Sequence, residues 1–208
     1  MNLFIKNAQY VWPGGDSPVL ENTSVLIEGS RIAAIGDVHK LASRAGNARW
    51  VNGEGLILIP GLVNTHHHFY QTLTRNFPRV QNAELFEWLV NLYPLWAKLT
   101  PEDFHLSTMI ASLELLESGC TTSADHSYLV PHGQNGIYHR QIEAATQAGL
   151  RFHLCRGSMS RSEKDGGLPP DHVVQTEDEI MTATKDLVQK AHQPEKGGMV
   201  RIIVAPCS

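Results

Sequence analysis

The spacing of apolar and polar positions changes along this chain of 208 residues, and it divides the sequence into two parts. Over the first 55 residues the apolar runs are short and lie between turn signals, which is typical of β-strands. A strand is expected at residues 3–5, and runs at residues 24–28 and 31–35 flank Gly29-Ser30, a two-residue hairpin signal. Because such short strands cannot build a large core, residues 1–55 are predicted to form part of a small β-sandwich.

From residue 56 onward, strand-like runs alternate with helical ones. Strands are expected at residues 56–64, 120–124, 150–155 and 199–205, and helices at residues 84–98, 101–118, 140–148 and 177–192. A loop rich in Ser, Gly and Pro spans residues 157–171, and it is either a flexible lid or a solvated connection.

Start and stop signals support these helices. Thr100 is expected to cap the second helix and Gly119 to end it, while Thr176 and Glu179 form a capping box before the last one. Pro94 is predicted to break the aromatic-rich first helix. The apolar positions of the second helix are Leu106, Met109, Ile110, Leu113 and Leu116.

Four strands, each but the last followed by a helix, predict an α/β fold of repeated βα units. A doubly wound sheet usually carries a glycine-rich phosphate loop after its first strand, and this chain has no GxGxxG there. The (β/α)8 TIM-type barrel is therefore favoured. A complete barrel takes about 250 residues, so residues 56–208 would hold only about the first four βα units.

A half-barrel would leave strand edges and apolar helix faces uncovered. We therefore expect the chain to be truncated or to depend on a partner, and the 208-residue polypeptide alone to be inactive and poorly stable. Robust ammonia release from the isolated polypeptide would contradict this expectation.

Composition and charge indicate the cellular compartment of the protein and the classes of binding partner that are not expected. The net charge is −4, without a basic stripe, which argues against nucleic acid and membrane surfaces as partners. The three cysteines are far apart and form no CxxC pair, which favours a reducing compartment. The first residues are too polar for a signal peptide, so a cytoplasmic location is expected.

Three consecutive histidines follow the apolar run at residues 56–64. Side chains alternate in a strand, so His66 and His68 point to one side and His67 to the other. Two imidazoles so placed on a rigid segment can bind one divalent ion, such as zinc or iron. The alternative is a surface histidine cluster near a turn, which a buried strand directly before the triplet disfavours.

The segment 60–68, PGLVNTHHH, placed after an N-terminal β segment, resembles the amidohydrolase superfamily. The closer resemblance is to its cytosine deaminase, guanine deaminase and chlorohydrolase branch, and within this branch to the 8-oxoguanine deaminases. The stretches that carry this closer resemblance are HFYQTLTR at 68–75, YPLW at 93–96, GCTT at 119–122, RGSMS at 156–160 and APCS at 205–208.

The resemblance implies a metal ion bound by His66 and His68 at the end of the first barrel strand. Two further histidines, an aspartate and a catalytic glutamate complete the site in this family, and here they would lie beyond Ser208. The ion would be zinc, with ferrous iron as the alternative. It would supply hydroxide that attacks the amidine carbon of a nucleobase-like amino-heterocycle and releases ammonia. The complete protein is expected to be a homo-oligomer.

Two residues are candidates for contact with such a substrate near the histidines. Gln71 lies three residues past His68, and its amide can donate to and accept from the edge of a nucleobase. Trp88 offers an aromatic face for stacking. The alternatives are a loop glutamine bonded to backbone and a tryptophan of the core.

Four more candidates end the later strands, where barrel sites are built. Asp125 and His126 are expected to support the ligand histidines, or else to form a buried polar pair that closes a loop. Arg156 is a candidate for holding a carbonyl oxygen of the substrate, with a structural ion pair as the alternative. Cys207 is placed to line the pocket or to be a small buried residue.

Three functions thus remain open from the sequence. The first is deamination of 8-oxoguanine or a related purine or pyrimidine, and the second is hydrolysis of a triazine-type amino- or chloro-heterocycle by the same metal chemistry. The third is a non-catalytic barrel fragment that serves assembly. Metal content separates the third from the first two, because an assembly protein need not hold stoichiometric zinc.

Overall fold

The computed structural model describes residues 1–134 and 136–207, and the chain divides into two compact units, Met1–Pro60 and Gly61–Ser208. Ser208, the last residue of the APCS stretch, lies outside the described residues. Among the described residues, no helix has both the length and the apolar character needed to cross a membrane.

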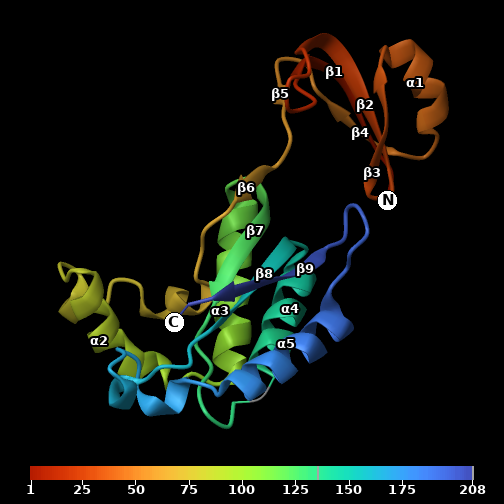
Figure 1. Ribbon diagram of the computed structural model, residues 1–208. Helices are drawn as coiled ribbons and strands as arrows, with labels where there is room; N and C mark the ends of the chain where they lie inside the picture. The colour runs from red at the N-terminus through yellow and green to blue at the C-terminus, as the bar shows by residue number, and fades with distance from the viewer. Residues whose placement is uncertain (135, 208) are drawn as a thin grey trace. The chain divides into compact units, whose positions relative to one another are not determined.

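The first unit is a β-sheet covered by one helix (Figure 1). Its strands run in the order β3-β2-β1-β4, and a short strand, β5, pairs with the far end of β1. The described residues of this unit form a single sheet, so they do not show the second layer of the expected β-sandwich. The elements are β1 (Leu3–Val11), β2 (Leu20–Glu28), β3 (Arg31–Gly36), α1 (Val38–Ala45), β4 (Arg49–Asn52) and β5 (Ile57–Leu58).

The hairpin predicted at Gly29-Ser30 is confirmed, because Glu28 pairs with Arg31 across the antiparallel strands β2 and β3. Helix α1 was not predicted from the sequence. Its start signal is Asp37, whose carboxylate accepts from two backbone N–H groups of the first turn. Phe4 and Leu26 of the sheet are buried in one cluster with Leu41 of this helix.

The single strand predicted over residues 56–64 is wrong. Its first part is β5 and pairs with β1, whereas its last part, β6 (Leu62–Asn64), pairs in parallel with a strand of the second unit. Pro60, which separates the two parts, has no N–H to donate to a neighbouring strand. The boundary between the two units therefore falls after Pro60, whereas the sequence placed the change of pattern at residue 56.

The second unit is a parallel sheet with the strand order β6-β7-β8-β9, the sequential order expected for consecutive βα units of a barrel. Helices α3, α4 and α5 run along one side of this sheet (Figure 1). The remaining strands and the helices are β7 (Cys120–Ser127), β8 (Arg151–Ser158), β9 (Val200–Pro206), α2 (Leu85–Trp96), α3 (Pro101–Glu117), α4 (Ile137–Ala148) and α5 (Glu177–Ala191). Short 3-10 turns lie at η1 (Phe69–Thr74), η2 (Pro78–Val80), η3 (Glu163–Asp165) and η4 (Asp171–Val173).

Alternation along the strands assigns their side chains to two faces. On the face turned toward the helices, the side chains of β7 and β8 are buried, and they include Asp125 and Arg156 as well as apolar residues such as Phe152 and Leu154. The other face, which would be the interior of a closed barrel, carries partly exposed side chains such as His126. This division decides which of the expected site residues can meet.

The predicted N-cap at Thr100 and the predicted capping box at Thr176 with Glu179 are confirmed, and Thr100 also forms a capping box with Asp103. The break predicted at Pro94 is wrong, because α2 continues through this proline to Trp96. Pro94 lies in the last turn of the helix, where its fixed φ is compatible with helix and only one backbone hydrogen bond is lost.

The buried face of α3 consists mainly of small residues. Leu106 and Leu113 of the apolar positions noted in the sequence are 50% and 48% exposed. Small side chains allow the helix to pack closely on β7 and α4. The buried residues of α3 are Phe104, Ser107, Thr108, Ala111 and Ser112.

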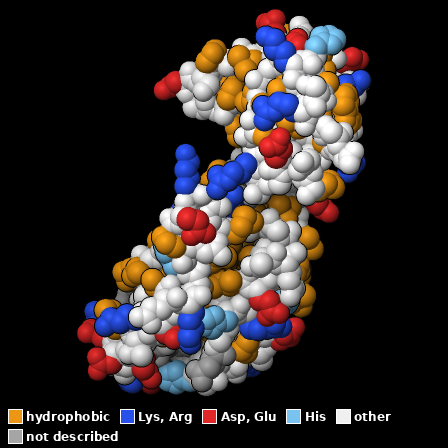
Figure 2. Space-filling view, turned by 90° about the vertical axis from the view of Figure 1, so that its right-hand side faces the viewer, with side chains coloured by type: hydrophobic (Ala, Val, Ile, Leu, Met, Phe, Trp, Pro, Cys, Tyr) orange, Lys and Arg blue, Asp and Glu red, His pale blue; other side chains and the backbone are white. Residues whose placement is uncertain are grey.

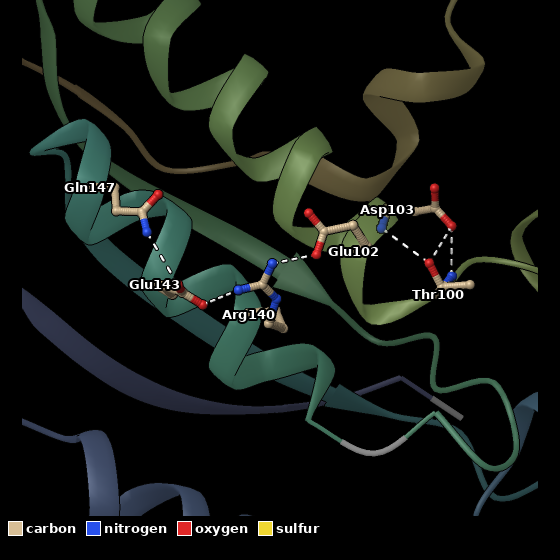
Figure 3. A network of polar contacts seen from close by, with 6 residues as sticks. All are labelled: Thr100, Glu102, Asp103, Arg140, Glu143 and Gln147. Carbon is tan, nitrogen blue, oxygen red and sulfur yellow. Dashed lines mark hydrogen bonds and ion pairs between the residues drawn. The ribbon is translucent and has the colours of Figure 1, made fainter.

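Charged residues join α3 and α4 at their N-terminal ends (Figure 3). Arg140 of α4 forms ion pairs with Glu102 of α3 and with Glu143 of its own helix. Gln147 donates to Glu143 at 3.2 Å. On the face shown in Figure 2, basic and acidic side chains lie interspersed within each unit, in keeping with the absence of a basic stripe from the sequence.

Candidate functional site

The three histidines follow β6, which ends at Asn64. The ring centroids of His66 and His68 lie 5.1 Å apart with perpendicular planes, and His66 is exposed while His68 is half-buried. The ring of His67 lies elsewhere, with its edge against Phe69 and its Nδ1 accepting the backbone N–H of His68 at 2.9 Å. The structure therefore brings the rings of His66 and His68 together, as alternation along the chain predicts, while the His67 ring packs against Phe69.

Strand β7 holds the histidine segment at three points. The N–H of His126 donates to the carbonyl of His67 at 2.8 Å, and Nδ1 of His68 lies 2.7 Å from the carbonyl of His126. The third contact runs from the N–H of Phe69 to Oδ1 of Asp125 at 2.7 Å. Because these contacts come from neighbouring residues of one strand, they fix the segment against the sheet.

The contact between His68 and the carbonyl of His126 determines the chemistry of the imidazole. A carbonyl only accepts, so Nδ1 carries the proton and Nε2 keeps its lone pair. Burial lowers the pKa of His68, which favours the neutral ring near pH 7. A neutral imidazole whose Nδ1 is bound to a carbonyl is the usual form of a histidine that binds a metal through Nε2.

These donors fit a divalent ion such as zinc, which binds imidazole nitrogen readily. Hydrolytic zinc sites use three protein ligands and one open position. In the part of the chain that the structure describes, no group of three or more His, Cys, Asp or Glu side chains is placed to hold a metal. His66 and His68 would supply two donors to such a site.

A pocket of about 430 Å³ opens beside His68. It is lined by Gln71, which the turn η1 carries, and by Trp88 of α2. The Trp88 ring packs edge-on against Trp96, with centroids 5.0 Å apart, and Trp96 in turn donates to Thr74 at 3.0 Å. The structure thus places both expected substrate-contacting residues at one pocket with His67 and His68, whereas His66 is not among the lining residues.

The structure does not bring Arg156, the third expected substrate contact, to this pocket. Arg156 points to the helix side of β8 and is 1% exposed. Its guanidinium donates to the carbonyl of Gly157 at 2.6 Å and to Oε1 of Gln175 at 2.8 Å, and it lies 5.3 Å from the ring centroid of Tyr138. These contacts tie Arg156 into the buried layer, and none of them is the ion pair that was considered as the alternative from the sequence.

Cys207 follows β9, and its N–H donates to the carbonyl of Ser158 at 2.9 Å. It lines a separate hollow of about 390 Å³ together with Met181 of α5. Burial raises the pKa of the Cys207 thiol, so the protonated form prevails near neutral pH. The structure does not bring Cys207 to the pocket beside His68.

Asp125 and His126 support the histidines by contacts other than those expected. The Asp125 carboxylate binds the backbone N–H of Phe69 and not a histidine ring. His126 acts through its backbone, while its ring nitrogen Nε2 lies 3.0 Å from the carbonyl of Ala205. Side-chain identity alone does not predict either arrangement, because both use the backbone of a distant segment.

Sequence reasoning missed Gln141, which donates to Oδ2 of Asp125 at 2.8 Å from helix α4. A signal was present. Gln141 interrupts an otherwise apolar stripe formed by Ile137, Ala144 and Ala145, all of which are buried. A glutamine at a core position of an amphipathic helix indicates a buried hydrogen-bond partner.

Stability should depend on pH through Asp125, which is fully buried. Burial raises its pKa from 3.8 to about 7. The folded state therefore binds this proton more tightly than the unfolded state between about pH 4 and pH 7, and the contribution of Asp125 to the free energy of unfolding falls as pH rises through this window. Asp125→Asn removes this titration while keeping an oxygen that can accept from Phe69.

We expect the stability of the wild type relative to Asp125→Asn to decline by up to about 4 kcal/mol across this pH range. Urea denaturation of both proteins at several pH values measures the difference, which also cancels the titration of the histidines. Parallel stability curves for the two proteins would show that Asp125 is ionised throughout.

Comparison with known proteins identifies relatives of the chain. A family model described as the amidohydrolase family matches residues 57–208. The chain is 52% identical over 152 residues to the 8-oxoguanine deaminase of Pseudomonas aeruginosa. The aligned region covers 73% of this chain and 34% of that protein. It is 33% identical over 199 residues to hydroxydechloroatrazine ethylaminohydrolase of a Pseudomonas species, covering 91% of this chain and 41% of the relative.

A solved structure shares the fold. The atrazine chlorohydrolase TrzN from Arthrobacter aurescens, in complex with zinc, matches with a TM-score of 0.89 and 32% identity over 99% of this chain and 47% of that chain. This chain spans about a third to two fifths of the length of the two curated relatives. With the family model covering residues 57–208, the chain belongs to the amidohydrolase family.

Proposed function

We propose that this chain supplies the first part of a metal-dependent hydrolase that deaminates a nucleobase-like amino-heterocycle, with 8-oxoguanine or a related purine or pyrimidine as the substrate. The observation that carries this proposal is the state of His68. Its Nδ1 is bound to the carbonyl of His126, its Nε2 keeps a lone pair, and its ring lies 5.1 Å from that of His66. The similarity to an 8-oxoguanine deaminase supports the substrate class.

His66 and His68 are the proposed ligands of one divalent ion, zinc or alternatively ferrous iron. The zinc complex of the related chlorohydrolase supports the choice of zinc. When bound, such an ion lowers the pKa of water to about 7 and polarises the group under attack. His67 stays outside the ligand set, because its Nδ1 already accepts the N–H of His68.

Gln71 and Trp88 are the proposed contacts to the substrate. The Gln71 amide makes only a long contact of 3.4 Å with the hydroxyl of Tyr70, so it can exchange this contact for the polar edge of a heterocycle. The indole of Trp88 offers a flat apolar surface. The volume of about 430 Å³ is within the range of small-molecule sites, which starts at about 300 Å³.

A triazine-type substrate is the second candidate. It is supported by the TM-score of 0.89 to the atrazine chlorohydrolase and by 33% identity to hydroxydechloroatrazine ethylaminohydrolase. The same ion would serve both reactions, so the difference between them lies in the groups that contact the ring. We further propose that the protein works in the cytoplasm as a homo-oligomer, and that neither nucleic acid nor a membrane is its partner.

The test uses the protein produced from its complete open reading frame, stripped of metal and then loaded with zinc or ferrous iron. Ammonia release is measured with 8-oxoguanine, guanine, cytosine and isocytosine, and product formation with an aminotriazine and a chlorotriazine. We expect stoichiometric metal and highest turnover on a purine or pyrimidine. Turnover on the triazines alone would favour the second candidate, a triazine-type substrate. A protein that holds no metal and shows no turnover would favour a role in assembly.

A further inference from the structure

Two polar side chains meet in the buried layer between the sheet and the helices. Asp125 of β7 and Gln141 of α4 are both 0% exposed, and Nε2 of Gln141 donates to Oδ2 of Asp125 at 2.8 Å. A buried carboxylate needs hydrogen-bond donors on its oxygens, because desolvation without them is unfavourable. The described residues give Asp125 two such donors, the amide of Gln141 and the backbone N–H of Phe69.

The second donor connects this pair to the histidines. Phe69 directly follows His68, and its N–H lies 2.7 Å from Oδ1 of Asp125. The Phe69 ring is buried and stacks on Phe152, with centroids 5.6 Å apart and planes at 19°. Both the backbone and the side chain of Phe69 are thus held, which leaves little freedom for the peptide that carries the His68 ring.

We propose that Gln141, acting through Asp125, is a positioning residue that holds His68 in the direction needed to bind the metal. The proposal rests on the proposed function of His66 and His68. If the amide of Gln141 is removed, Oδ2 of Asp125 loses its donor, and the carboxyl group turns or takes up a proton. The bond to Phe69 then weakens, and the His68 ring samples directions that the ion cannot use.

The chemistry of Gln141 favours this role over simple packing. Its neighbours on the buried stripe of α4 are Ile137, Ala144 and Ala145, so an apolar residue would suit the position. Its Oε1 has no hydrogen-bond partner among the described residues, which is unfavourable in a buried site. The hydrogen bonds of the Gln141 side chain are therefore made by its N–H group, and the closest acceptor of this group is Asp125.

The test compares zinc affinity in three variants of the protein produced from its complete open reading frame. Gln141→Leu removes the donor at similar volume, and Gln141→Met is the substitute if the leucine variant does not fold. Asp125→Asn keeps an oxygen for Phe69, and its new amide can donate to the free Oε1 of Gln141 after that side chain rotates. Gln147→Leu makes the same change at an exposed position of the same helix.

Zinc affinity is measured by competition with a chromogenic chelator, at a temperature where thermal unfolding shows each variant to be folded. We expect Gln141→Leu to weaken zinc binding by about tenfold or more, Asp125→Asn by less than about threefold, and Gln147→Leu not at all. Hydrogen exchange at the Phe69 amide should accelerate only in the Gln141 variant.

Unchanged zinc affinity in a folded Gln141 variant would overturn the inference, even if its melting temperature fell, because a purely structural role predicts that result. Equal weakening by Gln147→Leu would overturn it as well. The proposed function would fail differently, since the wild-type protein itself would then bind no zinc through His66 and His68.

Discussion

Replacement of His68 by alanine is expected to abolish stoichiometric zinc binding and to lower turnover by about a thousandfold or more. A bound ion contributes several kcal/mol to the stabilisation of a hydrolytic transition state, and each 1.4 kcal/mol corresponds to about tenfold in rate. Among the described residues, His66 and His68 are the two proposed ligands, so the loss of one would remove half of the donors that this chain would supply.

The structure explains why His68 should matter more than its neighbours. Its ring is half-buried and is oriented through Nδ1 by the carbonyl of His126, whereas His66 is exposed. A pre-oriented ligand loses less conformational freedom when the metal binds. We therefore expect His66→Ala to weaken zinc binding as well, but by a smaller factor than His68→Ala.

Metal analysis of the purified protein and ammonia release on the best substrate measure these effects. His139→Ala is the matched control, because His139 is an exposed histidine on α4, and its metal content and rate should equal those of the wild type. A His68→Ala protein that retains both one zinc per chain and the wild-type rate would reject His68 as a ligand.

Local signals were sufficient for much of the second unit. The N-cap predicted at Thr100 and the capping box predicted at Thr176 placed the starts of α3 and α5 correctly, since both signals depend on residues close together in the sequence. The order of the strands followed from the rule that βα units add parallel strands in sequence. The division at Pro60 was missed because a continuous apolar run hides which sheet each half joins.

The candidate site was predictable only in part. The pairing of His66 with His68 follows from alternation along one segment, and the position of Gln71 follows from its distance along the chain. Arg156 points to the helix side because it shares a face of β8 with Phe152 and Leu154, and the apolar character of these two positions is a signal that the sequence analysis did not use. The bond from Asp125 to Phe69 joins a side chain to the backbone of a segment 56 residues away, and no residue pattern marks such a contact.

Gly157 is a position at which the addition of one methyl group is expected to disturb the fold strongly. It lies in β8, where a Cβ atom would stand 2.3 Å from Cβ of Tyr128, 2.6 Å from Cα of Tyr128 and 2.9 Å from Nε2 of His126. The backbone of residue 128 cannot move aside as the end of a flexible side chain can. The carbonyl of Gly157 also accepts from Tyr138 and Arg156, which fixes this part of β8 from the helix side.

Gly157→Ala should therefore lower the free energy of unfolding by about 3 kcal/mol, the upper end of the range for overpacking in a filled interior. Zinc affinity should fall in the same variant, because the added methyl pushes on His126, whose carbonyl orients the His68 ring. Urea denaturation without metal measures the first effect, and chelator competition measures the second.

Gly36→Ala is the control for this substitution. Gly36 ends β3, and a Cβ atom there would meet no atom within 4 Å, so the change should leave stability within about 0.5 kcal/mol and zinc affinity unaltered. If Gly157→Ala were as stable as Gly36→Ala, β7 and β8 would have room to separate at their ends. This result would show that the carbonyl of His126 is held against His68 by something other than the close packing of Gly157 on Tyr128 and His126.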